Sequence, residues 1–276
     1  MGKIGTRKVP DSLSEQSIFL NVEQVGVTFP VRGNVHEQAA SEHDKRMIWD
    51  RRGRLRGVRA LTEISFALKN GDRLAIVGRN GSGKTTLLQI LAGILSPTEG
   101  RLVSRGRITS LINISLGIQP EASGHRNITL RGLAAGYSRA QIEEKREEIA
   151  EFSELGEFLG MPMESYSAGM RMRLTFAIAT AFTPEILILD EWLSAGDTAF
   201  KKRATRRMQE FVAKAGILVL ASHSRELILE NCETAIWIDG GRIRVLGPVK
   251  EVLEAYESSN TPAAPGPSPV AAAKAS

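Results

Sequence analysis

The residues of this chain best suited to chemistry form one glycine-rich segment that contains a lysine and a threonine. Residues 78–85 read Gly-Arg-Asn-Gly-Ser-Gly-Lys-Thr, which matches the G-x-x-x-x-G-K-[ST] pattern of phosphate-binding loops in full. Glycines let backbone N–H groups approach phosphate oxygens without a Cβ in the way, and a helix start adds unpaired N–H groups. We expect Lys84 to reach the β- and γ-phosphates of a nucleotide and the Thr85 hydroxyl to ligate Mg²⁺. The candidate phosphate-binding residues are Gly78, Arg79, Asn80, Gly81, Ser82, Gly83, Lys84, Thr85 and Thr86.

The sequence around this segment supplies the structural context that the pattern needs. An apolar run at 74–77 predicts a buried strand, and residues 86–92 predict a helix. A strand, a glycine loop and a helix in this order are typical of phosphate-binding loops. This context disfavours the alternative, which is a glycine-rich turn without a ligand.

Two adjacent carboxylates form the second candidate site. Asp190 and Glu191 directly follow the apolar run 186–189, which predicts a buried strand. Ligands of open α/β sheets bind at the carboxyl ends of the strands. We expect Asp190 to hold Mg²⁺ and Glu191 to act as general base on the attacking water. The alternative is a solvated acidic turn, which the upstream phosphate loop disfavours.

Composition limits the classes of protein that this chain can belong to. The 276 residues carry a net charge of 36 − 31 = +5, a modest excess that suits an acidic partner. The single cysteine, Cys232, excludes an intramolecular disulfide. Residues 1–16 lack the apolar centre of a signal peptide, and the longest apolar stretch, 174–189, is too short to span a bilayer. We therefore expect a soluble, cytoplasmic protein that reaches a membrane only through a partner.

Hydrophobic periodicity indicates an α/β protein. Alternating apolar residues predict strands over 17–31 and 59–69, and the polar segment 34–58 indicates a loop or short helical insertion. Further strands are expected within 100–114 and at 186–189, 217–221 and 235–238. Helices are expected from 139 to about 155, where Ser138 and Gln141 predict a capping box, from 167 to before Pro184, at 199–214 and at 249–258. Strands alternating with helices indicate a parallel core, with a helical insertion at about 118–182. The domain would span 17–258, and the Pro- and Ala-rich residues 259–276 predict a disordered tail.

A third motif lies on the predicted helix before the two carboxylates. Ser167 precedes that helix within Tyr-Ser-Ala-Gly-Met (166–170), where a lone serine is most often only a helix cap. Here Ser-Ala-Gly-Asp (194–197) follows the carboxylates, and Ser-His-Ser (222–224) follows the next strand. The order and spacing of these motifs from about residue 18 to 258 resemble the ATP-binding cassette of ABC transporters. The resemblance implies an α/β P-loop NTPase fold with a RecA-like core, an N-terminal antiparallel β region and an inserted helical subdomain.

The resemblance also implies a head-to-tail homodimer that binds ATP and Mg²⁺. Each ATP would lie between the phosphate loop of one subunit and Ser167 and Gly169 of the other. His223 would contact the γ-phosphate and help to position the attacking water. Ser194 and Asp197 would contact the opposite subunit. Phe29 lies where the family carries an aromatic residue that stacks on adenine, although an alternating core phenylalanine is the alternative.

Residues 166–170 depart from the usual Leu-Ser-Gly-Gly-Gln signature and resemble the branch that exports cell-surface polysaccharides: O-antigen, capsule and teichoic acid. This implies an ATPase at the cytoplasmic face of the inner membrane, bound to two copies of an integral permease with about six spans each. The glycan would be handled by the permease, since no glycan-binding domain follows residue 258. The alternative is a soluble ABC-type ATPase that acts on nucleic acid or ribosomes. Single-cassette length argues against it, so no nucleic acid is expected.

Two assignments stay open. The glutamine loop of the family would fall at Asn113, which could ligate Mg²⁺ with a side chain one methylene shorter, while Gln119 lies nearby. Five arginines between 51 and 59 either contact anionic lipid headgroups or form a solvated loop, and the solvated loop is favoured.

Overall fold

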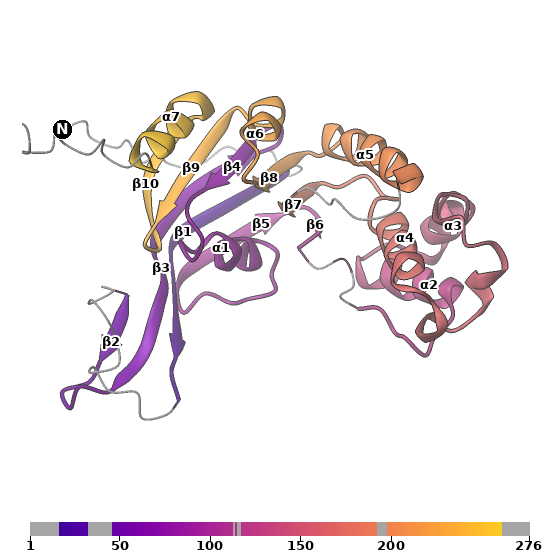
Figure 1. Cartoon of the computed structure of the whole chain (residues 1–276), viewed down its shortest axis with the longest axis horizontal. Coiled ribbons are helices and arrows are strands. Elements are labelled where there is room, and N and C mark those ends of the chain that lie inside the picture. The colour runs from indigo at the N-terminus through magenta and orange to yellow at the C-terminus, as the bar shows by residue number, and fades with distance from the viewer. Residues whose placement is uncertain (1–16, 33–45, 113, 115–116, 192–197, 261–276) are drawn as a thin grey trace, which may run out of the picture.

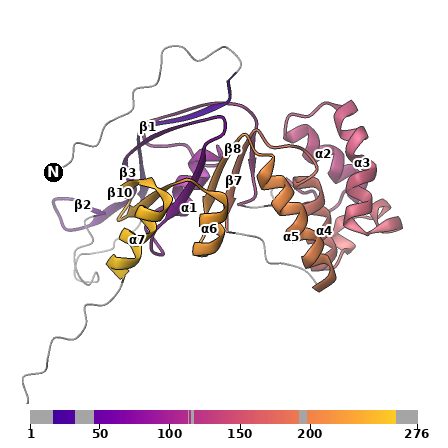
Figure 2. The ribbon, with the colours of Figure 1, turned by 90° about the horizontal axis from the view of Figure 1, so that it is seen from above.

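The computed structural model describes residues 17–32, 46–112, 114, 117–191 and 198–260. Two sheets lie beside each other at one end of the molecule, and a helical arm extends from the other end (Figure 1). Turned by 90°, the structure again shows the arm at the far end from the sheets (Figure 2). The α/β fold, with an antiparallel sheet, a mainly parallel sheet and helices inserted between strands, confirms the predicted fold class.

The first sheet is antiparallel and has the strand order β2-β3-β1-β5. Its strands are β1 (Phe19–Pro30), β2 (Met47–Trp49), β3 (Leu55–Lys69) and β5 (Glu99–Arg105). Leu20 and Val22 of β1 are fully or almost fully buried, as the period of two requires, and a register shift after Val22 brings Val25 to the buried face as well. The expectation of a loop or helical insertion at 34–58 was wrong in part. Within it β2 and the start of β3 form a hairpin, which the sequence hides because β2 has only three residues and charged residues surround it.

The second sheet carries the candidate site and has the strand order β10-β9-β4-β8-β7-β6. Five strands are parallel neighbours: β4 (Arg73–Val77), β6 (Ile108–Ser110), β7 (Ile186–Asp190), β8 (Ile217–Ala221) and β9 (Thr234–Asp239). β10 (Arg242–Pro248) pairs antiparallel with β9 at the edge. Sequence analysis missed β10, because its seven residues include two arginines, a glycine and a proline, and α6 (Arg225–Asn231), because seven residues are too few to show helical periodicity.

Helix α1 (Lys84–Leu91) packs between the two sheets. Its residues Leu87, Leu88, Ile90 and Leu91 are buried in one core with apolar residues of both sheets. On the opposite face of the parallel sheet, α5 (Thr198–Ala213), α6 and α7 (Val249–Asn260) cover a second core. Burial of α1 between the sheets fixes the start of this helix, and hence the phosphate loop, against β4. Ser259 and Asn260 belong to α7 rather than to the expected tail, and residues 261–276 lie outside the described residues.

The arm is helical and has a core of its own. It contains α2 (Gly124–Ala134), α3 (Arg139–Ser153), the short turns Gly156–Gly160 and Met163–Ser165, and α4 (Ala168–Ala179). The predicted capping box at Ser138 is confirmed: its hydroxyl accepts from Gln141 N, and the Gln141 side chain accepts from Ser138 N. Apolar residues of all three helices fill the arm's core. Among the helices of the described residues, none is long and apolar enough to cross a membrane.

Candidate functional site

The glycines of the phosphate loop lie where other residues would not fit. A Cβ on Gly78 would lie 2.2 Å from the carbonyl oxygen of Ile238 and 2.7 Å from Ser82 Oγ. Gly81 and Gly83 take positive φ angles of 76° and 112°, which residues with a Cβ rarely adopt. The loop therefore turns tightly from β4 into α1, with its backbone close to β9.

The start of α1 offers hydrogen-bond donors to a ligand. The first N–H groups of a helix have no intrahelical acceptors, and no side chain caps this one. The Ser82 hydroxyl is buried and has no hydrogen-bond partner in the described chain. A buried hydroxyl without a partner costs free energy, which a ligand that accepts or donates a hydrogen bond would recover. These features fit a bound phosphate group.

Lys84 lies across the loop that it follows. Its Nζ donates to the carbonyl oxygens of Gly78 at 2.6 Å and Arg79 at 3.2 Å. Burial lowers the pKa of Lys84, and the carboxylates of Asp190 and Glu191 oppose that effect. A partly buried ammonium group beside a glycine loop suits negatively charged phosphate oxygens.

The two carboxylates lie at the carboxyl end of β7, opposite the phosphate loop. The Thr85 hydroxyl donates to Asp190 Oδ2 at 3.2 Å, so the helix α1 and the strand β7 meet at this pair. Glu191 N donates to the carbonyl oxygen of Ala221 at 2.8 Å, which ties it to the end of β8. Glu191 has a φ of 68°, in the left-handed region that costs a residue with a Cβ about 1–3 kcal/mol.

His223 follows β8 and faces Glu191. Its Nε2 lies 3.7 Å from Glu191 Oε1, beyond direct hydrogen-bond distance. The two side chains are 55% and 61% exposed, so both are open to solvent at the mouth of the site. A proton acceptor and a second polar group therefore lie side by side where water has access.

These residues surround one cleft of about 660 Å³. It is lined by Arg46, Val58, Ala60, Asn80, Gly81, Gly83, Lys84, Thr85, Thr86, Asp190, Glu191, Ala221, Ser222 and His223. The cleft thus joins the first sheet, the phosphate loop and the ends of β7 and β8. Its volume falls within the usual range for small-molecule sites, about 300–1,000 Å³.

The oxygen atoms at the start of α1 and the end of β7 also fit Mg²⁺. The described residues contain no group of three or more His, Cys, Asp or Glu side chains that could hold a metal alone. Mg²⁺ commonly takes one or two protein oxygens and fills its shell with substrate phosphates and water. The Thr85 hydroxyl and the Asp190 carboxylate match that pattern.

Several predicted site residues lie away from this cleft. Phe29 pairs with Val58 in the first sheet and is 41% exposed, so it is not a core residue, and it does not line the cleft. Ser167 and Gly169 open α4 in the arm and also do not line it. Asn113, Ser194 and Asp197 lie outside the described residues.

Comparison with known proteins identifies the family. Residues 61–194 match the family described as ABC transporter. The O-antigen export system ATP-binding protein RfbE of Yersinia enterocolitica is 40% identical over 231 residues, which cover 82% of this chain and 95% of that protein. The chain belongs to the ABC transporter family. It is therefore a nucleotide-binding ABC ATPase.

Two other relatives of this ABC cassette are proteins of which only about half to two thirds matches this chain. The O-antigen export system ATP-binding protein RfbB of Myxococcus xanthus is 42% identical over 202 residues, covering 73% of this chain but only 46% of that protein. The teichoic acids export ATP-binding protein TagH of Listeria innocua serovar 6a is 36% identical over 220 residues, covering 80% of this chain and 65% of that protein.

Solved structures agree on the ABC fold. An ATP-binding subunit of an ABC transporter superposes with a TM-score of 0.62 at 19% identity, covering 88% of this chain and 95% of that chain. A dimeric ATP-binding cassette bound to ADP and Pi superposes with a TM-score of 0.58 at 19% identity, covering 83% and 98%.

Arg46 is one cleft residue of this ABC cassette that sequence analysis missed. Its Nη1 donates to the carbonyl oxygen of Gly81 at 2.6 Å, and its own carbonyl accepts from Arg59 N at 2.8 Å. The β2–β3 hairpin therefore carries a guanidinium group to the outer side of the phosphate loop. No local pattern gives this contact, because 35 residues separate Arg46 from Gly81.

We expect Arg46→Ala to raise the KM for ATP about 10- to 150-fold with little change in kcat, since a hydrogen bond to a charged group contributes about 1.5–3 kcal/mol. The loss of a positive charge beside the loop would act in the same direction. Steady-state ATP hydrolysis measures the effect, and Arg51→Ala, an exposed arginine on the same hairpin, is the matched control. An unchanged KM for Arg46→Ala would show that this side chain does not support nucleotide binding.

Proposed function

We propose that this chain hydrolyses ATP to power an exporter of a cell-surface polysaccharide or lipid-linked glycan across the inner membrane. The observation that supports hydrolysis is the meeting of Thr85 and Asp190, 3.2 Å apart, beside Glu191 and His223 in one cleft. The observation that supports export is the set of relatives, which are named as export ATP-binding proteins for O-antigen or teichoic acids.

The residues of the cleft have different roles in hydrolysis. The backbone of residues 78–83 and the Lys84 ammonium bind and orient the phosphates. Thr85 and Asp190 would hold Mg²⁺, which would neutralise charge on the phosphate oxygens. Glu191 accepts the proton of the attacking water, and His223 orients that water and the γ-phosphate. Positioning and charge stabilisation supply most of the catalysis in such phosphoryl transfers.

Further roles follow from a homodimer of cassettes, as the family resemblance implies. Ser167 and Gly169 do not line the cleft of their own chain, and in the proposed dimer they would complete the cleft of a second copy. The Ser167 hydroxyl accepts from Met170 N at 3.2 Å, which leaves it at the first turn of α4, where an anion is favoured. Ser194 and Asp197 would contact the second copy, Phe29 the adenine, and Asn113 the Mg²⁺.

The membrane partner is a permease, present in two copies with about six spans each, which handles the glycan. The cassette, residues 17–258 with its helical subdomain at about 118–182, binds to the cytoplasmic face of the inner membrane through that permease. The names of the relatives favour this function over an ATPase that acts on nucleic acid.

A deletion strain tests the proposal. Cells that lack this chain should lose the glycan from their surface and accumulate it inside, and the wild-type chain should restore export. A Glu191→Gln chain should not restore it, although it should still co-purify with the permease. Normal surface glycan in the deletion strain would overturn the export function while leaving ATP hydrolysis by the purified chain open to direct assay.

A further inference from the structure

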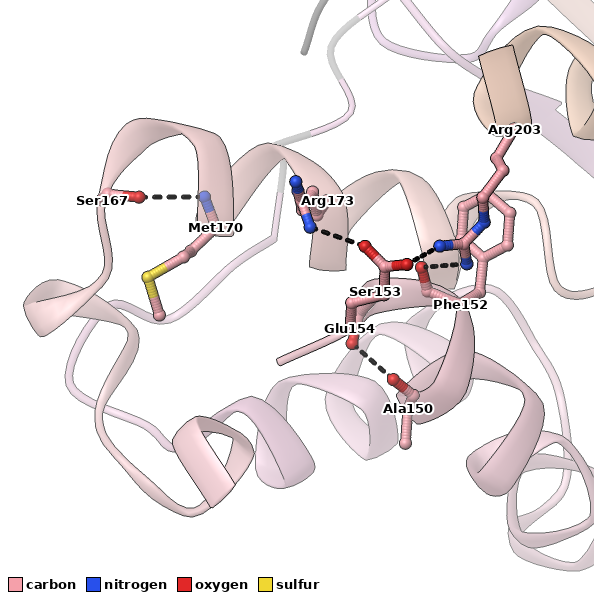
Figure 3. Close-up of polar contacts among 8 residues, drawn as sticks. All are labelled: Ala150, Phe152, Ser153, Glu154, Ser167, Met170, Arg173 and Arg203. Carbon is pink, nitrogen blue, oxygen red and sulfur yellow. Dashed lines mark hydrogen bonds and ion pairs between the residues drawn. The ribbon is translucent and has the colours of Figure 1, made fainter. Parts of the chain in front are cut away.

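The carboxylate of Glu154 joins three helices. Glu154 follows α3 with a φ of 54°, a left-handed conformation that is uncommon for a residue with a Cβ. Its Oε2 accepts from Arg173 Nη1 of α4 at 2.8 Å, and its Oε1 accepts from Arg203 Nη1 of α5. Figure 3 shows the carboxylate between the two guanidinium groups. We call Glu154, Arg173 and Arg203 the carboxylate clamp.

Aromatic rings hold both arginines in place. Arg173 lies over the ring of Phe200 of α5 at 5.0 Å, and Arg203 lies over the ring of Phe152 of α3 at 5.1 Å. Arg203 also donates to the carbonyl oxygen of Phe152 at 3.2 Å. Arg173 therefore contacts both Glu154 and Phe200. Arg203 contacts Glu154 and both the ring and the carbonyl oxygen of Phe152. The position of each arginine is fixed by more than its ion pair.

The clamp lies where the arm meets the sheets. Phe152 packs against the core of the arm and also against the core on the helical face of the parallel sheet. Its ring lies 5.6 Å from that of Phe200 and 5.9 Å from that of Phe176 of α4. The three rings form the apolar side of this junction, and the carboxylate clamp forms its polar side.

Two of the clamped helices carry proposed site residues at their starts. Arg173 lies six residues after Ser167, about 9 Å along α4. Arg203 lies in the second turn of α5, which begins at Thr198 directly after the 194–197 segment in the sequence. A change in the angle between α4 and α5 would therefore displace Ser167 relative to the start of α5.

We propose that Glu154 is a positioning residue, which fixes α4 relative to α5 so that Ser167 meets the nucleotide of a second copy in the proposed dimer. This inference rests on the proposed function for its consequence but not for its geometry. The three side chains are 23–46% exposed, so their ion pairs contribute little to global stability. The effect of the clamp is therefore expected in the placement of α4, more than in the unfolding temperature.

Glu154→Gln tests the proposal in the full-length chain, because it keeps the size of the side chain and removes its charge. Hydrogen exchange of the first two turns of α4 should become about 5- to 10-fold faster than in the wild type, as expected for the loss of a coupled pair. Glu157→Gln is the matched control, since Glu157 is an exposed carboxylate three residues later. Its exchange and its melting temperature should equal those of the wild type.

The consequence is read in a Glu191→Gln background by the ATP-dependent formation of dimers. Glu154→Gln should weaken this dimerisation about 10-fold without changing the affinity of the monomer for ATP, and Arg203→Gln should do the same with no further loss in the double variant. Unchanged hydrogen exchange in α4 would overturn the clamp, and faster exchange with unchanged dimerisation would overturn the positioning role. If the Glu191→Gln chain forms no dimer with ATP, the proposed dimer fails, and hydrogen exchange alone decides whether Glu154 holds α4.

Discussion

Glu191→Gln is expected to lower the ATP turnover number of this chain by about 10²- to 10⁴-fold, the usual contribution of a general base. The amide has nearly the same size as the carboxylate but does not accept the proton of water at neutral pH. The hydrogen bond from Glu191 N to Ala221 involves only the backbone, so it is retained in the variant. Binding of ATP should therefore persist, and a dimer with two uncleaved nucleotides should accumulate.

Measurement of phosphate release together with size-exclusion chromatography in the presence of ATP and Mg²⁺ checks both parts of this expectation. Glu251→Gln, an exposed carboxylate on α7, is the control and should behave as the wild type. Wild-type phosphate release by Glu191→Gln would remove Glu191 from the mechanism. His223 would then be the first residue to test as the base.

Lys84→Ala should weaken ATP binding about 100-fold or more, which corresponds to about 2.8 kcal/mol at 1.4 kcal/mol per factor of ten. The Lys84 ammonium is partly buried and already held at the loop by the carbonyl oxygens of Gly78 and Arg79. Little ordering of the side chain is then needed when phosphates bind, so most of the charge–charge attraction contributes to affinity.

Equilibrium binding of a fluorescent ATP analogue measures this loss without requiring turnover. Lys250→Ala on α7 is the matched control because its side chain is exposed and distant from the cleft residues in the sequence. Circular dichroism should show the same helix content for both variants. Wild-type affinity in Lys84→Ala would place the phosphates somewhere other than the loop.

The sequence predicted those parts of the fold and the site whose cause is local. The strand–loop–helix at 73–91 and the strand before Asp190 each depend on neighbouring residues, and the structure has both. The capping box at Ser138 could likewise be predicted because all its atoms lie within four residues, and the structure confirms it. The placement of Thr85 against Asp190 followed from a general rule, that ligands gather at the carboxyl ends of parallel strands.

The features that sequence analysis missed depend on contacts between distant residues. Arg46 meets the phosphate loop 35 residues away, and Glu154 meets Arg173 and Arg203 at separations of 19 and 49 residues. The β2–β3 hairpin was hidden in a segment whose charged residues resemble a solvated loop. In the structure two of these charged residues, Arg54 and Arg56, form ion pairs with Asp50.

The left-handed backbone at Glu191 has a cost for the stability of the whole chain. Glycine would adopt this φ of 68° without strain, so the fold itself does not require a glutamate at this position. A selection for heat resistance alone would tend to remove the proposed base, since relaxing this residue recovers folding free energy. Engineering of a more durable cassette is therefore better directed to the packing around α7 or the hairpin turn at Gly53 than to the end of β7.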